Sequence, residues 1–370
     1  MHDPKSIWAI GCMSGTSMDA VDVAAVLTDG ERIEKFGKTS FFPFDSENRK
    51  TLANANGCWP GDDRVFEAER VVVSAHKKAL MDNFTGSVIG FHGQTLAHDP
   101  ENGRTHQAGD GQEIADATGI ATVWDFRTRD MELGGQGAPL APFFHFALAK
   151  FLGEYSPVAF LNLGGIANVS WVDPAASAPE SRGALFAFDT GPANSLLDAL
   201  IQSKAGARCD DGGKISSSGK ENRELLEKLL QAPYFAAKAP KSLDRAQFLY
   251  ALAMLDHQSL EDSAATLAEF TARSVAEGFK LLPSLPSKTI VTGGGVKNLD
   301  VMRRLSAALP TELLDGSSVG LSPHALEAQA FAYLAVRVMR GLPISSPSTT
   351  GCSEPAIGAR ISYPSRRKLD

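Results

Sequence analysis

Short apolar runs alternate with glycine-rich polar turns along this chain, and the alternation predicts strands that meet at hairpins. Apolar residues at 7–10 and 21–27 flank a polar turn, which is typical of a strand–turn–strand unit. A unit of the same design follows at 158–171, around the polar turn 162–168. Two hairpins of one design indicate a duplicated architecture in which each half opens with its own turn.

The rest of the pattern mixes helices with strands. Apolar residues at helical spacing predict several helices, and short apolar runs that end in polar turns predict further strands. Polar turns at strand ends indicate an α/β protein with its site in a cleft. The helices are predicted at 63–84, 262–281, 299–309 and 325–339, and the strands at 87–91, 121–124, 185–188 and 289–292.

The composition is that of an ordinary globular protein, and it excludes several functional classes. A chain of 370 residues suits two domains, and its net charge of −7 argues against general binding to nucleic acid or membrane surfaces. The 4 cysteines form no C-x-x-C pair, which fits a reducing cytosol better than a disulfide or zinc framework. We find neither a signal-peptide pattern nor an apolar stretch of about 18 residues, so we expect a cytoplasmic protein without a membrane span.

The turn between the first two predicted strands carries the strongest chemical signal. Its sequence, GCMSGTSMDAVD at 11–22, combines glycines, hydroxyls and carboxylates. Glycines let backbone N–H groups approach an anion, and hydroxyls add donors for phosphate oxygens. The Asp19 carboxylate would repel a bare phosphate, so it favours a Mg²⁺ ion beside phosphate groups. An ordinary hairpin turn with polar residues explains this stretch equally well at this point.

Asp189 is the main candidate for a catalytic group. It follows the apolar run 185–188 and precedes Thr190-Gly191-Pro192 and a predicted helix. A carboxylate at a strand end over a cleft is well placed as a general base. A helix N-cap or turn aspartate is the competing interpretation, with about half the weight.

Three further segments are weaker candidates. Arg127 and Arg129 lie in a charged cluster that is either a solvated loop or a site for phosphate or carboxylate oxygens. His92 follows a predicted strand and is either a ligand contact or a structural histidine. Gly293-Gly294-Gly295 joins a strand to a helix, where the backbone can approach a ring or a phosphate, but the signal is weak alone. The P-loop, the opening G-x-G-x-x-G, the zinc spacings and G-x-S-x-G are all absent from the sequence.

Together these segments resemble one family, the anhydro-N-acetylmuramic acid kinases of bacterial cell-wall recycling. The matching pieces run in family order over nearly the whole chain, which makes the set specific although each piece is weak. The chain departs from the family pattern at Ala20 and Ala193, where glycine is usual, and at Leu243-Asp244, where a Thr-Gly pair is usual. The pieces are GCMSGTSMDAVD, FHGQT, DFRTRD with GGQGAPLAP, FLNLGGIANVSW, FDTGPANSLLDA, DGGK, PKS and TGGGVKN.

The resemblance implies a fold and a division of the chain. The family has the actin-like, sugar-kinase fold: two RNase H-like α/β domains about a central ATP cleft, which agrees with the two predicted hairpins. Domain I, with the phosphate-binding hairpin, is then expected at 1–136 plus about 346–370. Domain II, with the catalytic aspartate and the adenosine turn, is expected at 137–345.

The resemblance also implies a reaction. Asp189 matches the family's catalytic aspartate, and it would remove a proton from a water that attacks the anomeric carbon of 1,6-anhydro-N-acetylmuramic acid. The opened O6 would take the γ-phosphoryl group of ATP, giving N-acetylmuramate 6-phosphate and ADP. Mg²⁺ would bridge the phosphates near Asp19, directly or through water. The nucleotide residues implied are Gly15, Thr16, Ser17, Met18, Asp19, Ala20, Val21, Asp22, Gly293, Gly294 and Gly295; the substrate residues are His92, Thr95, Arg127, Arg129, Gly135 and Asn168.

Two other functions compete with this one. Another sugar kinase of the same superfamily would deprotonate a hydroxyl of an intact sugar, and a panel of sugars separates the two. An actin- or Hsp70-like ATPase would turn over ATP without a sugar. We expect a small-molecule substrate and neither a nucleic-acid nor a membrane partner, and the sequence leaves a homodimer open.

Overall fold

The structure is a computed structural model, and it describes residues 5–82, 84–322 and 325–365. The described chain forms two compact units. Unit 1 takes the residues up to 153 together with 178–180 and those from 325 onward, and unit 2 takes 154–177 and 181–322. None of the helices in the described part combines the length and the apolar character that a membrane crossing requires.

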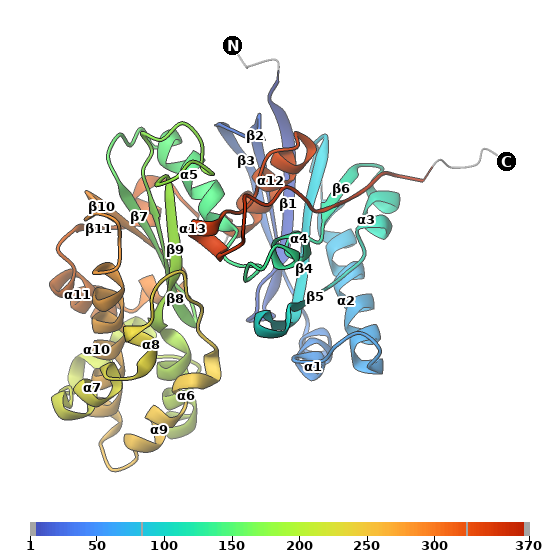
Figure 1. The fold of residues 1–370 in the computed structure, drawn as a ribbon. Helices are drawn as coiled ribbons and strands as arrows, with labels where there is room; N and C mark the ends of the chain where they lie inside the picture. Colours follow the sequence, from blue (N-terminus) through green and yellow to red (C-terminus); the bar gives the residue numbers. More distant parts are fainter. Residues whose placement is uncertain (1–4, 83, 323–324, 366–370) are drawn as a thin grey trace. The chain divides into compact units, whose positions relative to one another are not determined.

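Unit 1 is built on a seven-stranded mixed sheet (Figure 1). Its strands lie in the order β12, β6, β4, β1, β2, β3, with β5 paired to β4. β1, β2 and β3 form an antiparallel meander, whereas β4 runs parallel to both β1 and β6. The strands are β1 (Ile7–Ser14), β2 (Ala20–Thr28), β3 (Ile33–Pro43), β4 (Val88–Asp99), β5 (Arg104–Ala108), β6 (Ala121–Trp124) and β12 (Arg360–Ser362).

Helices cover both faces of this sheet. On one face, alternate residues of β1, β2 and β4 form an apolar core with α1 (Ser46–Ala55), α2 (Asp63–Leu80) and α3 (Gly111–Thr118). The other face carries α12 (Leu326–Met339), whose apolar residues are buried almost all round, and α5 (Ala141–Phe151) packs beside it. The short helices α4 (Thr128–Glu132) and α13 (Pro347–Thr350) complete unit 1.

Glycines in the sheet set the distance of α12. A Cβ added to Gly11 would lie 1.7 Å from the Ala328 carbonyl oxygen, and one added to Gly90 would lie 2.1 Å from that of Phe331. Only glycine leaves room for the helix backbone at these points. The first strand is therefore glycine-containing for packing as well as for its turn.

Unit 2 has a five-stranded sheet in the order β11, β10, β7, β8, β9. Its strands are β7 (Val158–Leu163), β8 (Ile166–Val172), β9 (Leu185–Pro192), β10 (Lys288–Thr292) and β11 (Glu312–Asp315). α10 (Leu260–Phe279) and α11 (Leu299–Ala308) pack on one face of the sheet. A second apolar core joins α10 to α6 (Asn194–Ala205), α7 (Arg223–Leu230), α8 (Pro233–Ala236) and α9 (Tyr250–Met254).

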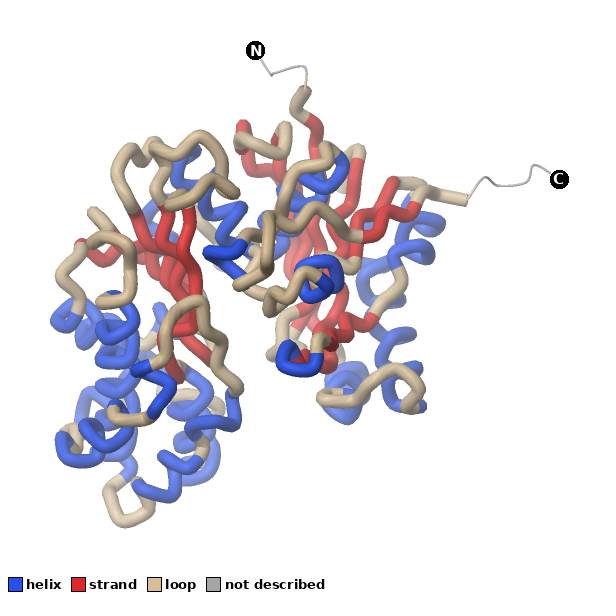
Figure 2. The backbone as a smooth tube through the Cα atoms, viewed as in Figure 1, coloured by secondary structure: helices blue, strands red, loops and turns tan. Residues whose placement is uncertain are grey.

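The helices α6 to α10 of unit 2 lie next to one another (Figure 1), and Figure 2 shows them in blue beside the red strands of that unit. Short 3₁₀ turns connect the elements of both units. They are η1 (Pro100–Asn102), η2 (Asp211–Gly213), η3 (Ser216–Ser218), η4 (Arg245–Phe248), η5 (Gly294–Lys297) and η6 (Gly316–Val319).

The two sheets share one strand order. In both, a three-stranded antiparallel meander comes first, its first strand lies beside a parallel strand, and that strand lies beside another parallel one. This is the RNase H-like arrangement, so the predicted α/β class with two domains of one design is confirmed.

The division of the chain differs from the expected one. Residues 137–153 and those from 325 to 345 belong to unit 1, whereas the sequence placed them in the second domain. The reason is the packing of α5 and α12 on the first sheet. The start of domain I at 1–4, the tail after 365, and Asn83 of the predicted helix 63–84 lie outside the described residues.

Two predicted strands are longer than their apolar runs. The run 87–91 continues as β4 through Asp99 because it pairs with β5, and the run 185–188 continues as β9 through Pro192 because it pairs with β8. Ladder hydrogen bonds with distant partners override the turn-like polar sequence. His92, Thr95 and Asp189 therefore lie within strands rather than in turns.

Candidate functional site

The β1–β2 turn of unit 1 is compact and leaves its hydroxyl residues at the surface. Met18 adopts a left-handed φ of 55° and donates its N–H to the Gly15 carbonyl oxygen at 2.9 Å. Thr16 and Ser17 are exposed, whereas Met18 is buried as an anchor. Asp19 forms an ion pair with Arg49, with 3.1 Å between Asp19 Oδ1 and Arg49 Nη2. The turn thus presents hydroxyls on a fixed backbone.

Two carboxylates meet below this turn on the face of the sheet that carries α12. Burial, together with Glu327 and Asp19, raises the pKa of Asp22 to about 7. Its Oδ1 is buried and has no hydrogen-bond partner among the described residues. Glu327 lies in the first turn of α12, and part of its surface is exposed to solvent. The surrounding protein removes water from its carboxyl group and so raises its pKa, whereas the positive charge of Arg127 lowers it. The arrangement concentrates negative charge beside the turn.

Arg127 is held by His92. Its Nε and Nη2 lie 3.1 and 3.0 Å from His92 Nε2, and its Nη1 donates to the Gly137 carbonyl oxygen at 2.8 Å. His92 Nδ1 lies 3.1 Å from the Gly93 carbonyl oxygen, so Nδ1 carries the proton and Nε2 accepts. Burial and the Arg127 charge keep the pKa of His92 well below its usual value. Both ring nitrogens are used within the protein, which makes His92 an orienting group for Arg127.

Asp130 fixes the glycine-rich loop 134–137. It is fully buried, and it accepts hydrogen bonds from the Gly137 N–H at 2.7 Å and from the hydroxyls of Thr350 and Ser345. A Cβ on Gly135 would lie 2.2 Å from Asp130 Oδ2, so glycine is needed there for packing. Arg129 points elsewhere: it is exposed and pairs with Glu132 at 3.0 Å. The structure therefore separates the two predicted arginines.

A polar cavity of about 330 Å³ in unit 1 is lined by residues from within β4, from β5 and from the end of β6. It combines the aromatic face of Trp124 with titratable and hydroxyl side chains. His92 is the only predicted site residue that lines it, and Thr95 lies nearby through its hydrogen bond from Gln107 at 3.3 Å. The lining residues are Glu69, Phe91, His92, Thr105, His106, Gln107, Gly109, Trp124, Asp125, Thr128 and Arg360.

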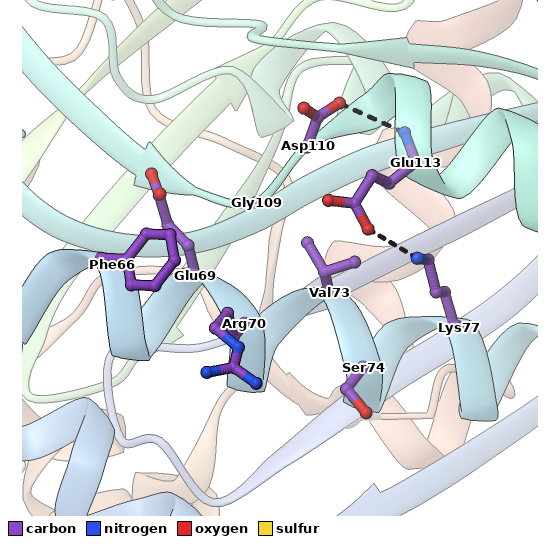
Figure 3. Close-up of a pocket in the computed structure, with 9 residues that line it drawn as sticks. All are labelled: Phe66, Glu69, Arg70, Val73, Ser74, Lys77, Gly109, Asp110 and Glu113. Carbon is purple, nitrogen blue, oxygen red and sulfur yellow. Dashed lines mark hydrogen bonds and ion pairs between the residues drawn. The ribbon is translucent and has the colours of Figure 1, made fainter.

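A second hollow, of about 460 Å³, lies between α2 and α3 and contains none of the predicted site residues (Figure 3). Side chains of α2 line one side, including Phe66 and Lys77, and Asp110 and Glu113 line the other. Lys77 pairs with Glu113 at 2.6 Å across it. This charged hollow shares Glu69 and Gly109 with the polar cavity, but its other lining residues are separate from the groups described above.

In unit 2, a row of polar residues crosses the sheet. Thr292 of β10 is the register partner of Asn162 of β7, Asn162 faces Asn168 of β8, and Asn168 faces Asp189 of β9. All four are partly exposed, whereas their neighbours along each strand are mostly buried against α10 and α11. Directly paired residues point to the same face of a sheet. The predicted base and the predicted substrate residue Asn168 therefore lie side by side.

Asp189 is held from several directions. Its Oδ2 accepts the Leu243 N–H at 2.8 Å, its own N–H donates to the Lys241 carbonyl oxygen at 2.9 Å, and its carbonyl oxygen accepts the Tyr234 hydroxyl. Burial raises its pKa to about 7, and the Leu243 hydrogen bond opposes the rise. The N-cap of α6 is Ala193, not Asp189, so the capping interpretation is wrong.

The glycine turn after β10 packs against the end of β7. Gly293 has a φ of 85°, and a Cβ there would lie 2.5 Å from Asn162 Oδ1. A Cβ on Gly295 would lie 2.7 Å from the Leu163 Cβ. Gly294 is exposed and has room around it. The turn is thus shaped by packing at its ends and open in the middle.

Sequence reasoning missed three residues. Glu327 lies at the start of a helix that was expected only to pack in a core. A charged residue in that apolar helix could have indicated a functional role. Asn162 comes from a stretch expected to be a polar turn, but it lies in β7, and only the pairing of β7 with β8 and of β8 with β9 places it in one row with Asp189. Tyr234 comes from a segment without a motif, so nothing local indicated its contact with Asp189.

Comparisons with known proteins agree over the whole chain. A family model described as anhydro-N-acetylmuramic acid kinase matches residues 7–364. Anhydro-N-acetylmuramic acid kinase 1 of Jannaschia sp. (strain CCS1) is 50% identical over 363 residues, covering 98% of this chain and 97% of that protein. The anhydro-N-acetylmuramic acid kinase of Roseobacter denitrificans (strain ATCC 33942 / OCh 114) is 48% identical over 358 residues, covering 97% and 95%.

A more divergent relative and a solved structure extend the comparison. The anhydro-N-acetylmuramic acid kinase of Rhodopseudomonas palustris (strain BisB18) is 42% identical, covering 96% of this chain and 100% of that protein. The activator of the 2-hydroxyisocaproyl-CoA dehydratase from Clostridium difficile with bound ADPNP aligns with a TM-score of 0.43 and 13% identity, covering 90% of this chain and 97% of that one. The structural likeness is too distant to bear on the site.

Proposed function

Because the chain belongs to the anhydro-N-acetylmuramic acid kinase family, we propose that its two units divide the kinase reaction between them. Unit 1 binds the phosphates of ATP at the β1–β2 turn, and unit 2 supplies the base, Asp189. The single observation that carries the division is the environment of Asp189, a half-buried carboxylate with a pKa near 7 in a row of polar residues. A base whose pKa lies near the working pH combines ionisation with proton affinity.

The residues around the unit 1 turn fit a magnesium ion bound together with phosphates. Mg²⁺ prefers oxygen ligands and usually takes only one or two carboxylates, with phosphates and waters completing its shell. The buried, unpartnered Oδ1 of Asp22 and the nearby Asp19 supply that chemistry. Within the described ranges no set of three or more acidic, histidine or cysteine side chains is arranged to hold an ion alone. When bound, the ion would neutralise charge on the phosphates.

Arg127 is the cation placed for an anionic group. It has five N–H donors, and His92 and Gly137 engage three of them. Its remaining N–H groups can bind either the transferred phosphoryl group or the lactyl carboxylate of the substrate. The exposed Gly15-to-Ser17 backbone and the open Gly294 turn serve the nucleotide in this proposal.

The proposed reaction couples hydrolysis to phosphoryl transfer. Asp189 takes a proton from a water, whose oxygen forms a bond to the anomeric carbon while the bond between that carbon and O6 breaks. O6 then bonds to the γ-phosphorus of ATP, and ADP leaves. The products are N-acetylmuramate 6-phosphate, ADP and a proton, which belong to cell-wall recycling. A single base activating water resembles inverting glycoside hydrolysis, and the transfer step depends mainly on positioning and electrostatics. Because the reaction consumes ATP, the proposal includes a cytoplasmic location for the enzyme.

The test uses the purified chain with ATP, Mg²⁺ and 1,6-anhydro-N-acetylmuramic acid in water enriched in ¹⁸O. Mass spectrometry should find one ¹⁸O at the anomeric carbon of the sugar phosphate. Label only in phosphate would refute the coupled reaction. Phosphorylation of N-acetylmuramic acid at an equal rate would favour the alternative, a kinase that acts on an intact sugar hydroxyl.

A further inference from the structure

We propose that the segment from Tyr234 to Leu243 is a positioning element that fixes Asp189 for proton abstraction. The inference rests on the role proposed for Asp189 as the base. Three separate polar groups of Asp189 bind this one segment: its N–H binds the Lys241 carbonyl, its carbonyl oxygen accepts the Tyr234 hydroxyl, and its Oδ2 accepts the Leu243 N–H at 2.8 Å. A strand residue held in this way cannot rotate its peptide or its carboxylate independently.

The segment is itself fixed by the helical core of unit 2. Tyr234 and Leu243 are each 7% exposed and belong to the apolar cluster formed with α6, α7 and α10. Lys241 is 9% exposed; its Nζ donates to the Tyr234 carbonyl oxygen at 2.8 Å and lies 4.4 Å from the centre of the Tyr234 ring. Burial of these side chains couples the position of Asp189 to the packing of helices that carry no predicted site residue.

The contact to the carboxylate is made by a backbone group. The Leu243 N–H stabilises the ionised form of Asp189 and holds Oδ2, so Oδ1 is the oxygen available to a water. Leu243 is also where the chain departs from the family pattern. Because the bond comes from the main chain, the side chain can change, and here leucine anchors the amide through its burial.

Among the side chains that the structure describes, few charged or titratable groups lie near Asp189. Tyr234 comes from α8, Lys241 and the exposed Asp244 come from the following loop, and β8 contributes the neutral Asn168. Burial raises the pKa of Tyr234 and lowers that of Lys241. In a plot of kcat against pH, the fall in kcat on the acid side reports the protonation of the base. If Lys241→Met keeps the wild-type acid limb of this plot, the limb belongs to Asp189 rather than to the lysine.

The first experiment removes one hydroxyl. Tyr234→Phe keeps the buried ring but loses the bond to Asp189, and Tyr250→Phe, at a half-exposed tyrosine stacked on Phe248, is the matched control. We expect kcat to fall on the order of 10-fold in Tyr234→Phe, with KM for ATP and for the sugar within about twofold of wild type. The control should keep the wild-type kcat. Equal kcat values for the two variants would overturn the proposal.

The second experiment removes the N–H at residue 243. In Leu243→Pro the acid limb of the kcat profile should move to higher pH by about one unit or more, because an N–H bond to a carboxylate is lost. Leu243→Met keeps that N–H, so its acid limb should stay with wild type. The proposal is contradicted if the Leu243→Pro variant folds and its acid limb lies at the wild-type pH. If that variant does not fold, the kcat of Tyr234→Phe tests the proposal instead.

Asp189→Asn separates this inference from the proposed function. If Asp189→Asn keeps its turnover, Asp189 is not the base and the proposed function fails. If Asp189→Asn loses turnover while Tyr234→Phe and Leu243→Pro behave as wild type, the base stands and the positioning element fails.

Discussion

The hairpins β1–β2 and β7–β8 occupy the same place in their sheets, but the first turn is exposed and the second is bound by a helix. In unit 1 the turn leaves Thr16 and Ser17 exposed. In unit 2 the carbonyl oxygens of Gly164 and Gly165 accept three N–H groups from the start of α6, at 3.1 to 3.2 Å. The second turn is therefore tied down by its own helix, and the first is open to a ligand.

The difference shows how one topology can serve two tasks. Helix N–H groups that bind a turn are not available to an anion. Unit 2 keeps its polar chemistry on the sheet instead, in the row that ends at Asp189. We infer that the copy with the open turn binds phosphates and that the other copy carries the base.

The largest expected effect comes from Asp189→Asn. The variant should fold and bind nucleotide, yet lose kcat by on the order of 10²-fold or more, as for a lost general base. Steady-state kinetics and a nucleotide titration measure the two properties. Asp198→Asn is the matched control, because burial also raises the pKa of that carboxylate in unit 2, to about 6, away from β9. Near-normal turnover in Asp189→Asn would contradict the inference that unit 2 supplies the catalytic base.

Gly11→Ala tests the packing of unit 1. The added Cβ would meet the α12 backbone at 1.7 Å, so the free energy of unfolding should fall by about 2 kcal/mol or more. Denaturant unfolding measures it. Gly15→Ala has no heavy atom closer than 3.8 Å and should change that free energy by less than about 0.5 kcal/mol. Equal stabilities would show that α12 does not depend on the glycine.

Asp22→Asn tests the open turn. The variant should raise the Mg²⁺ concentration for half-maximal activity by roughly 10-fold, because one buried anionic oxygen is lost. Since the pKa of Asp22 is about 7, the wild type should need less Mg²⁺ as the pH rises through 7, and the variant should lose that dependence. Asp29→Asn, at the far end of β2, serves as control. An unchanged Mg²⁺ requirement would place the ion elsewhere.

The smallest effect is expected at Arg129. Arg129→Ala breaks an exposed ion pair, so kcat/KM should stay within about twofold of wild type. Arg127→Met removes the half-buried guanidinium and should lower kcat/KM by roughly 10-fold or more. Kinetics with both substrates measure the difference. A larger loss at Arg129 than at Arg127 would reverse the assignment made from their burial.

Much of the fold could be predicted from local patterns. The paired runs around residues 11–20 and 162–168 predicted both hairpins, because strands that are buried along almost their whole length appear in the sequence as short apolar runs. The ends of β4 and β9 could not be predicted, since polar residues such as Gln94 and Asp189 join a strand only when a partner strand supplies hydrogen bonds. The boundary between units was misplaced for a similar reason, as α12 packs on strands that begin the chain.

The candidate site divides in the same way. Sequence motifs predicted Asp189 and the Gly15-to-Asp22 turn as site residues. The order of the motifs along the chain was enough to predict the family and its activity, which the comparisons confirm. Motifs did not distinguish Arg127 from Arg129, which have the same chemistry and lie two positions apart. Their partners distinguish them: Arg127, at the start of α4, binds His92 of β4, and Arg129 pairs with its helical neighbour Glu132.

The sequence by itself determined the duplicated hairpins, the polar turns and the enzyme family, because these depend on residue types at short spacing. Only the tertiary structure decided that Glu327 lies beside Asp22, that Asp189 shares a row with Asn162 and Asn168, and that Tyr234 holds Asp189. Those contacts join residues from distant parts of the chain. Burial and strand pairing bring these residues together, and contacts between residues far apart in the chain cannot be predicted from a local sequence pattern.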